Sequence, residues 1–397
     1  MHLGSSALFT REAAAAAPLR LALVTETFPP EVNGVAGTVA RLFDVLRARG
    51  HQVELVRPRQ PVDRSAPGDG HAAHLLTAGM ALPLYPGLRI GLPATGLLRR
   101  RWAESRPQLV HVATEGPLGW SALRAAGGLG IPVSSDFRTN FHAYSRHYRL
   151  GALSRPILAA LRAFHNRTQC TMVPTDALRR QLLAHGFRNL QVLARGVDTA
   201  LFDPQRRSDA LRRAWGAGAD TVVALYVGRI APEKNLALLC RAYARMRQVR
   251  PALRLVVVGD GPARAQVQAR CPDAVFAGTR RGPDLAAHYA SADLLLFPSM
   301  TETFGNVTPE AMASGLAVLA FDDAAAGELI ESGRNGMLAP LGDEVAFTAQ
   351  AMRLAADPVQ LRALGRSARR TALELSWDRV AAGFEASARR VLGHAAA

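Results

Sequence analysis

The chain has 397 residues, 49% of them hydrophobic, a length too great for one ordinary core and suited to two domains. Its formal net charge of +16 comes almost wholly from arginines that are dispersed and not interleaved with aromatic residues, which argues against a dedicated nucleic-acid groove. The charge leaves two explanations open, an anionic partner such as a membrane surface or a compositional bias toward arginine.

Residues 1–18 are expected to form a disordered tail or to be an over-long start of the sequence. No basic region precedes their alanine-rich run, so no signal peptide is predicted, and no apolar run in the chain is long enough to span a bilayer. We therefore expect a cytoplasmic protein. Three widely separated cysteines without a C-x-x-C partner are expected to be small buried side chains, not a zinc site or disulfide framework: Cys170, Cys240 and Cys271.

Short apolar runs alternate with amphipathic stretches from Leu19 onward, which predicts βαβ units and parallel sheets. In the first half the predicted strands are Leu19–Val24, Val53–Val56, Leu109–Val112, Ile131–Ser134, Cys170–Val173 and Gln191–Leu193. In the second half they are Thr221–Val227, Leu253–Val258, Ala274–Ala277, Asp293–Phe297 and Ala317–Ala320. Predicted helices include Val35–Arg49, Asp176–His185, Asn235–Arg247, Pro309–Ser314 and Glu344–Ala355.

The fold class that follows is α/β, with two doubly wound, Rossmann-like domains facing each other across a cleft. We place the first domain at residues 19–195, a polar interdomain connection at 196–220 and the second domain at 221–375. Residues 376–397 are helical in pattern and are expected to cross back to the first domain. Ligands are expected in the cleft, at the carboxyl ends of the strands.

The loop after the first predicted strand reads T-E-T-F-P-P-E-V-N-G-V, from Thr25 to Val35. Asn33 tolerates a tight turn, and Gly34 lets the backbone approach a ligand closely. The following helix start offers free N–H groups to an anion. The loop is not a G-x-G-x-x-G fingerprint, and an ordinary strand-to-helix loop is the alternative.

The segment Met80–Trp102 mixes leucines and other apolar residues with Arg89 and the run Arg99, Arg100 and Arg101. This pattern is typical of an interfacial segment with a basic edge, which would favour an anionic membrane. A pair of core helices with solvated arginines is the alternative.

The stretch Ser135–Tyr148 reads S-D-F-R-T-N-F-H-A-Y-S-R-H-Y, directly after a predicted strand. Arginines, histidines and aromatic residues are denser here than in a simple connecting loop. Arg138 and His142 are therefore candidate catalytic residues.

The stretch Val227–Asn235 reads V-G-R-I-A-P-E-K-N and also follows a strand. Arg229 and Lys234 place two cations at the mouth of a parallel sheet, which suits a diphosphate. Lys234 is the only lysine in the chain. A compact ammonium differs chemically from a guanidinium, so its retention in an arginine-rich sequence indicates a function.

The stretch Ser299–Gly315 reads S-M-T-E-T-F-G-N-V-T-P-E-A-M-A-S-G. Pro309 must lie in the first turn of any helix, which puts Glu302 in a loop and Glu310 in the first turns. Carboxylates there can accept hydrogen bonds from sugar or ribose hydroxyls. The helix start also offers N–H groups to an anion, next to Phe304, Gly305, Asn306 and Val307.

Together these four stretches resemble glycosyltransferase family 4, the retaining enzymes of GT-B architecture that include bacterial alpha-mannosyltransferases and lipid glycosyltransferases. The likeness covers nearly the whole chain from Leu19. Its most specific part is the pair Glu302 and Glu310 together with Arg229 and Lys234.

The resemblance implies a hexosyltransferase that moves mannose, glucose or a uronic acid from a GDP- or UDP-sugar to a lipid or glycan acceptor. Arg229 and Lys234 would hold the donor diphosphate, Glu302 the sugar hydroxyls and Glu310 the ribose. Gly34 would contact the diphosphate from the opposite domain. The loops expected to cradle the nucleobase contain Gly259, Gly278 and Thr279.

The resemblance also implies that the donor's own phosphate oxygen accepts the acceptor's proton, and that cationic side chains replace a metal ion in stabilising the leaving group. No cofactor is expected, and no D-x-D pair for a metal stands at a strand end. Two alternatives are a nucleotide-sugar epimerase of the same architecture and a basic binding protein with a degenerate site.

One stretch departs from the family pattern. Many relatives carry His-Thr-Asn/Asp-Phe where this chain has Arg138-Thr139-Asn140-Phe141, with His142 four residues after Arg138. A buried cation beside a sugar needs an anion to balance it. The hypothesis that follows is a uronic acid on the donor, with Asp136 or an anionic acceptor headgroup as alternatives.

Overall fold

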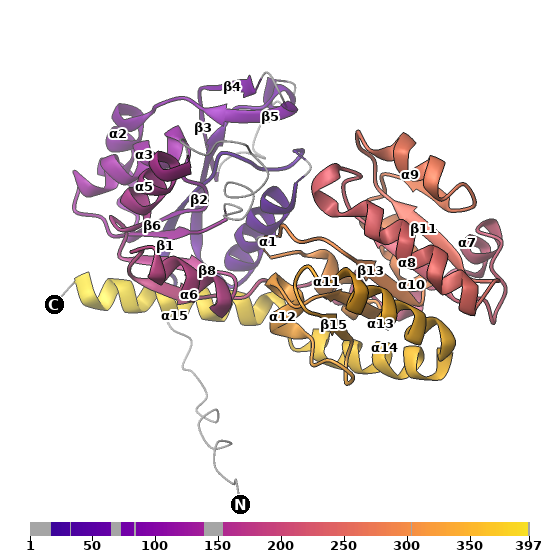
Figure 1. Cartoon of the computed structure of the whole chain (residues 1–397). Coiled ribbons are helices and arrows are strands. Elements are labelled where there is room, and N and C mark those ends of the chain that lie inside the picture. Colours follow the sequence, from indigo (N-terminus) through magenta and orange to yellow (C-terminus); the bar gives the residue numbers. More distant parts are fainter. Residues whose placement is uncertain are drawn as a thin grey trace, which may run out of the picture.

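The computed structural model describes residues 17–31, 33–64, 73–82, 85–138, 154–302 and 304–395. Two α/β domains lie side by side, and a long C-terminal helix runs beneath the first (Figure 1). Of the tail predicted at residues 1–18, only Ala17 and Pro18 fall within the described ranges.

The first domain contains, over its described residues, a seven-stranded parallel sheet in the order β3-β2-β1-β6-β7-β8-β9. The strands are β1 (Arg20–Val24), β2 (Gln52–Pro58), β3 (His74–Thr77), β6 (Leu109–Val112), β7 (Val133–Asp136), β8 (Cys170–Val173) and β9 (Leu190–Val192). The helices are α1 (Gly34–Ala48), α2 (Thr95–Ser105), α3 (Pro117–Gly127), α5 (Ser154–His165) and α6 (Asp176–Ala184).

Both faces of this sheet are buried. Leu21 and Leu23 of β1 pack with apolar residues of α1, whereas Ala22 and Val24 pack on the other face with residues of α2 and α3. A strand covered on both faces has no polar side to alternate with, which explains why its sequence is a continuous apolar run.

The second domain contains, in the part of the chain that the structure describes, a six-stranded sheet in the order β12-β11-β10-β13-β14-β15. The strands are β10 (Val223–Val227), β11 (Arg254–Val258), β12 (Val275–Gly278), β13 (Leu294–Phe297), β14 (Ala317–Phe321) and β15 (Met337–Ala339). The helices are α7 (Asp209–Ala214), α8 (Leu236–Val249), α9 (Arg264–Arg270), α10 (Gly282–Ser291), α11 (Val307–Ala313), α12 (Ala324–Leu329), α13 (Glu344–Ala356) and α14 (Pro358–Leu373).

The strand order reverses between β1 and β6 in the first sheet and between β10 and β13 in the second. In doubly wound sheets such a switch point opens a crevice beyond the carboxyl ends of the strands, and ligands bind there. The segments that follow β10 and β13 are the two stretches that carry Arg229, Lys234, Glu302 and Glu310, the last of these in the first turn of α11.

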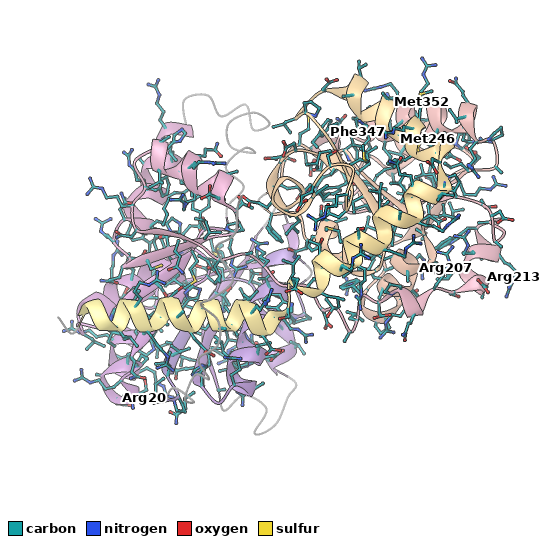
Figure 2. The ribbon with its side chains drawn as sticks, turned by 90° about the horizontal axis from the view of Figure 1, so that it is seen from below. Arg20, Arg207, Arg213, Met246, Phe347 and Met352 are labelled. Carbon is teal, nitrogen blue, oxygen red and sulfur yellow. The ribbon has the colours of Figure 1, made fainter. Side chains whose placement is uncertain are left out.

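The C-terminal helix α15 (Trp377–Ala395) returns to the first domain and runs along its underside (Figure 2). One stripe of this helix, Ala381, Phe384, Ala388 and Val391, is buried in the same core as Leu21. Glu385 accepts hydrogen bonds from Arg49 Nε at 2.5 Å and from His51 Nε2 at 2.9 Å. The helix therefore ties the chain end to the first sheet.

Residues 196–220, predicted to be a polar connection, are folded onto the second sheet. Phe202 and Trp215 belong to the core of that domain. Arg212 is 3% exposed and donates to the backbone carbonyls of Ser291, Gly218 and Thr221. Figure 2 shows Arg207 and Arg213 of this segment on the second domain. Arginines of this segment, which suggested a solvated linker, therefore serve partly as hydrogen-bond donors to backbone carbonyls of the second domain.

The segment Met80–Trp102 is neither a helix pair nor one continuous amphipathic element. It consists of an antiparallel hairpin, β4 (Gly79–Leu82) and β5 (Tyr85–Gly91), followed by α2. Leu98 and Trp102 are fully buried, so α2 faces the core on one side. As expected, the three cysteines are buried thiols.

Candidate active site

A cleft of about 1010 Å³ lies between the carboxyl ends of the two sheets. The loops after β1, β7 and β9 line it from the first domain, and those after β10, β12 and β13 line it from the second. Among its lining residues are eleven that the sequence singles out: Asn33, Gly34, Arg138, Arg229, Lys234, Glu302, Phe304, Gly305, Asn306, Val307 and Glu310.

The second-domain wall is built on a pair of linked loops. Lys234 Nζ donates to Glu302 Oε1 at 2.5 Å, and Ser299 Oγ donates to the same oxygen at 2.7 Å. Thr301 Oγ1 donates to the carbonyl of Glu233 at 3.2 Å. The loop after β10 and the loop after β13 are therefore joined before any ligand enters, which preorganises the charges that they carry.

Arg229 is held differently. Its side chain is 57% exposed, and its Nη1 lies 3.6 Å from Glu233 Oε1. Its backbone is anchored, because the buried Tyr226 donates from its hydroxyl to the Arg229 carbonyl at 2.9 Å. A fixed backbone with a solvated guanidinium at the cleft wall suits the capture of an anionic ligand.

Glu310 lies in the first turn of α11, as the position of Pro309 predicts. Tyr289 of α10 donates from its hydroxyl to Glu310 Oε2 at 2.9 Å. Burial raises the pKa of Glu310 to about 7, and the hydrogen bond from Tyr289 opposes that shift. The carboxyl group is therefore poised between its two protonation states near neutral pH.

The first-domain wall contains the start of α1. Asn33 caps this helix, because its Oδ1 accepts from the backbone N–H of Ala36 at 2.8 Å, while its Nδ2 donates to Thr27 Oγ1 at 2.8 Å. A Cβ atom added to Gly34 would lie 3.6 Å from Nδ2 of Asn306 in the second domain. The two domains thus approach each other closely at Gly34, next to unpaired N–H groups of the helix start.

Arg138 follows β7 and forms an ion pair with Asp136 Oδ2. The same oxygen lies 3.4 Å from Nε2 of the buried His111. Burial opposes ionisation of Asp136, but Arg138 and His111 outweigh it and hold the pKa of this carboxyl well below its usual range. The hypothesis that Asp136 is a partner of Arg138 is therefore confirmed.

Sequence reasoning missed Arg195, which lies just after β9 and lines the cleft. Its guanidinium lies 5.4 Å from the ring centroid of Phe304, across the domain boundary. Burial and the neighbouring Arg138 lower the pKa of Arg195 to about 9. Arg195 follows the end of a predicted strand, where ligands are expected, and this position could have identified it. The sequence analysis instead treated Arg195 as the last residue of the first domain.

Gly259, Gly278 and Thr279, which the sequence predicts in the loops that cradle the nucleobase, are not among the residues that line the cleft. Gly259 packs behind the loop after β10, where an added Cβ would lie only 1.9 Å from the Gly228 carbonyl oxygen. The chain turns at Gly278 with φ of 72°, so the residues beyond it reach the cleft instead: Arg280, Arg281, Gly282 and Leu285.

His142 lies outside the described residues, so the structure does not place it. Within the described ranges, no group of three or more His, Cys, Asp or Glu side chains is arranged to hold a metal ion.

Comparison with known proteins agrees with this geometry. Residues 32–201 match a family model described as Glycosyltransferase Family 4, and residues 221–357 match one described as Glycosyl transferases group 1.

Among curated proteins, the chain is 37% identical to a GDP-mannose-dependent alpha-mannosyltransferase of Mycolicibacterium smegmatis, over 90% of this chain and 94% of that protein. It is 36% identical to the Mycobacterium tuberculosis protein of the same name, over 90% and 93%. It is 25% identical to an alpha-monoglucosyldiacylglycerol synthase of Acholeplasma laidlawii, over 82% and 86%.

Among solved structures, the Anabaena protein HepE in complex with UDP and glucose matches with a TM-score of 0.72 at 18% identity, over 93% of this chain and 98% of that one. Sucrose-phosphate synthase from Thermosynechococcus elongatus matches with a TM-score of 0.72 at 20% identity, over 94% and 99%. The predicted GT-B arrangement of two Rossmann-like domains is confirmed.

Proposed function

The chain belongs to glycosyltransferase family 4 and is a nucleotide-sugar-dependent hexosyltransferase, and from this premise we propose that it transfers mannose from GDP-mannose to a lipid or glycan acceptor. We propose further that the transfer retains the anomeric configuration and needs no metal ion.

One observation carries this proposal. Arg229 and Lys234 from the second domain and the α1 start at Gly34 from the first line one cleft. Glu302 and Glu310 line the same cleft. Cations for a diphosphate thus lie beside carboxylates for vicinal hydroxyls, which is the charge pattern of a nucleotide diphosphate sugar.

The choice of GDP-mannose rests on the curated relatives. Two proteins whose names specify GDP-mannose and mannosyl transfer share 37% and 36% identity with this chain over 90% of its length. The epimerase alternative receives no support from the relatives described above, because they are transferases.

We propose a role in donor binding for each of these cleft residues. Arg229 and Lys234 bind the diphosphate, Glu302 the mannose hydroxyls and Glu310 the ribose hydroxyls. The α1 start at Gly34 meets the diphosphate from the first domain. For the nucleobase, the cleft residues after β12, Arg280 to Gly282, replace the glycines predicted from sequence.

The chemistry follows from these positions. As the mannosyl–phosphate bond breaks, negative charge grows on the leaving diphosphate, and Arg229 and Lys234 stabilise it. The acceptor oxygen attacks the face from which the diphosphate departs, and a phosphate oxygen takes the acceptor's proton. The protein's contribution is charge stabilisation and positioning, with no obligatory protein base.

The acceptor side is proposed to lie near a membrane surface. Arg99 and Arg100 of α2 are exposed, and Leu92 and Leu97 close to them are 39% and 38% exposed. Arg101 does not belong to this surface, because its Nε donates to Glu54 Oε1 at 2.7 Å. Among the described helices, none has both the length and the apolar character needed to cross a bilayer.

The test is a donor panel. The purified full chain is incubated with membrane lipids and GDP-mannose, UDP-glucose or UDP-glucuronate, and the products are identified by mass spectrometry. A mannosylated product formed preferentially from GDP-mannose is expected. An epimerised nucleotide sugar without a glycosylated product, or transfer from the UDP-sugars alone, would refute the proposal.

A further inference from the structure

Glu31 lines the cleft but has no part in the donor chemistry proposed above. Three hydrogen-bond donors face its carboxylate. Thr27 Oγ1 donates to Oε2 at 2.5 Å, the backbone N–H of Arg89 donates to Oε1 at 3.2 Å, and Gln60 Nε2 lies 3.5 Å from the same Oε1. An ionised carboxylate accepts at both oxygens, so it satisfies donors on both of its sides. Glu31 thus links the loop after β1 to the strand β5.

The carboxylate of Glu31 also fixes the direction of the next hydrogen bonds. A threonine hydroxyl carries one proton, and Thr27 donates it to Glu31. Its oxygen is then an acceptor for other neighbours, and Asn33 Nδ2 donates to it at 2.8 Å. The amide oxygen of Asn33 therefore faces the other way, where it accepts from the backbone N–H of Ala36 at 2.8 Å. The cap of α1 has this orientation because the side chain at position 31 accepts.

This cap positions the N–H groups at the start of α1. The first hydrogen bond within the helix runs from Gly37 N to the Asn33 carbonyl at 3.2 Å. The N–H groups of Gly34 and Val35 precede it and are not used by the helix. Both residues line the cleft, and Figure 1 shows α1 on the side of the first domain that faces the second. An anion here accepts from N–H groups whose direction depends on a well-formed first turn.

Other contacts hold the neighbouring hairpin without Glu31. In the same loop, Glu26 accepts from the backbone N–H of Gly91 in β5 and, at 2.8 Å, from that of Leu118 at the start of α3. Removing the charge of Glu31 should therefore leave the β4–β5 hairpin in place and act on the cap of α1.

We propose that Glu31 is a positioning residue for the donor: through Thr27 its carboxylate orients the amide of Asn33, and thereby the start of α1 that meets the diphosphate. The proposal rests on the proposed function, since it takes this helix start to be a diphosphate contact.

A glutamine in place of Glu31 would have one acceptor atom for donors on two sides. Two of the three donors face the Oε1 side, so the amide oxygen is expected there and the amide nitrogen faces Thr27. The Thr27 hydroxyl must then turn and donate to Asn33. This turns the nitrogen of the Asn33 amide toward the N–H of Ala36, and the cap is lost.

The experiment measures nucleotide binding and needs no transfer. Titration calorimetry on the full chain at pH 8 compares GDP with guanosine, which lacks the phosphates. Glu31→Gln should weaken GDP binding about tenfold, the loss of one hydrogen bond to a charged group, and leave guanosine binding unchanged. Thr27→Val should have the same effect, whereas Thr27→Ser, which keeps the hydroxyl, should bind like the wild type. Glu54→Gln is the matched control, because Glu54 accepts from Arg101 and Trp102 in the same domain but is not among the cleft-lining residues.

The double variant tests the connection between the two side chains. Because Glu31 acts through Thr27, combining Glu31→Gln with Thr27→Val should weaken GDP binding no more than either change alone. Effects that multiply, equal weakening of GDP and guanosine, or unchanged GDP binding in both single variants overturns the proposal. Loss of the melting transition in both single variants shows a purely structural network and overturns it too.

The same titration separates this proposal from the proposed function. A wild type that binds UDP and not GDP contradicts the choice of GDP-mannose, yet a loss of UDP affinity of about tenfold in Glu31→Gln, with uridine unchanged, still supports the role of Glu31. A mannosylated product from the wild type, together with unaltered GDP binding in Glu31→Gln and Thr27→Val, supports the function and rejects the positioning role.

Discussion

Lys234 and Glu302, 68 residues apart, form a hydrogen-bonded ion pair of 2.5 Å between Nζ and Oε1. The pair joins the two loops at the switch point of the second sheet, and both side chains are less than one-fifth exposed. An ammonium reaches one carboxylate oxygen as a point charge, whereas a guanidinium would occupy more space and demand a planar partner. The pair gives a physical reason for a single lysine in an arginine-rich chain.

We predict that Lys234→Ala and Glu302→Ala each reduce transfer by about 10²–10³, the usual cost of one lost contact in a preorganised site. Because each mutation also frees the other partner, the double mutant should be less impaired than the product of the two effects. Steady-state rates and melting curves are the measurements. The exposed pair Arg241 and Glu344 provides a control, and Arg241→Ala should leave rates unchanged. Near-normal turnover in either single mutant would refute the assignment.

Gly34 tests the contact between the first domain and the diphosphate. A Cβ there would lie 3.6 Å from Asn306, an ordinary van der Waals distance, so Gly34→Ala should fold normally. The methyl group would nevertheless occupy space at the proposed diphosphate position, so we expect the donor KM to rise about tenfold or more. Gly127→Ala on α3 meets nothing within 4 Å and should behave as the wild type. A donor KM unaltered in Gly34→Ala would remove Gly34 from the site.

Donor binding should depend on pH through Glu310. Burial raises its pKa to about 7, so the carboxylate that we propose accepts from the ribose hydroxyls is scarce at pH 6 and predominant at pH 8. The donor KM should therefore fall about tenfold between these two pH values. Glu310→Gln should abolish the dependence. Tyr289→Phe removes a hydrogen bond that lowers the pKa, so the midpoint should move to higher pH. A donor KM constant from pH 6 to 8 in the wild type would contradict this role.

Membrane association should depend on the exposed arginines of α2. Replacing Arg99 and Arg100 by glutamate removes an attraction of about 1 kcal/mol per residue and adds repulsion, so flotation with anionic vesicles at low salt should be lost. The matched control is the same double change at the exposed Arg362 and Arg366 of α14, in the second domain. A protein that stays unbound to anionic vesicles at low salt, or equal loss in both double mutants, would rule out this surface.

The sequence predicts a segment well where the residues packed around it restrict which side chains it can carry. Strands such as Val223–Val227 are buried on both faces, so their apolar runs are unmistakable. The short edge strands His74–Thr77 and Met337–Ala339 were missed, whereas the equally short edge strands Leu190–Val192 and Val275–Gly278 were predicted, so a run of three or four residues at a sheet edge is a weak signal that sequence analysis finds in some places and not in others.

The candidate site also contains residues that the sequence predicts and residues that it does not. Glu302, Glu310, Arg229 and Lys234 were predictable because Pro309 and the strand ends fix their local positions. Arg195 was not, since nothing local brings it to Arg138: the fold does, by bringing the ends of β7 and β9 to the same cleft. The hydrogen bonds of Arg212 could not be predicted either, because their acceptors are backbone carbonyls, and their positions depend on the fold and not on residue type.

The most direct test of the central claim is the fate of a labelled anomeric carbon. The full chain is given GDP-mannose labelled with ¹³C at C1 and a lipid or alkyl glycoside acceptor, with and without EDTA. The one-bond carbon–hydrogen coupling at C1 of the product then distinguishes an α from a β linkage. We predict an α-linked mannoside, matching the donor, formed at the same rate in the presence of EDTA. A β-linked product, or transfer restored only by adding magnesium or manganese, would contradict the account.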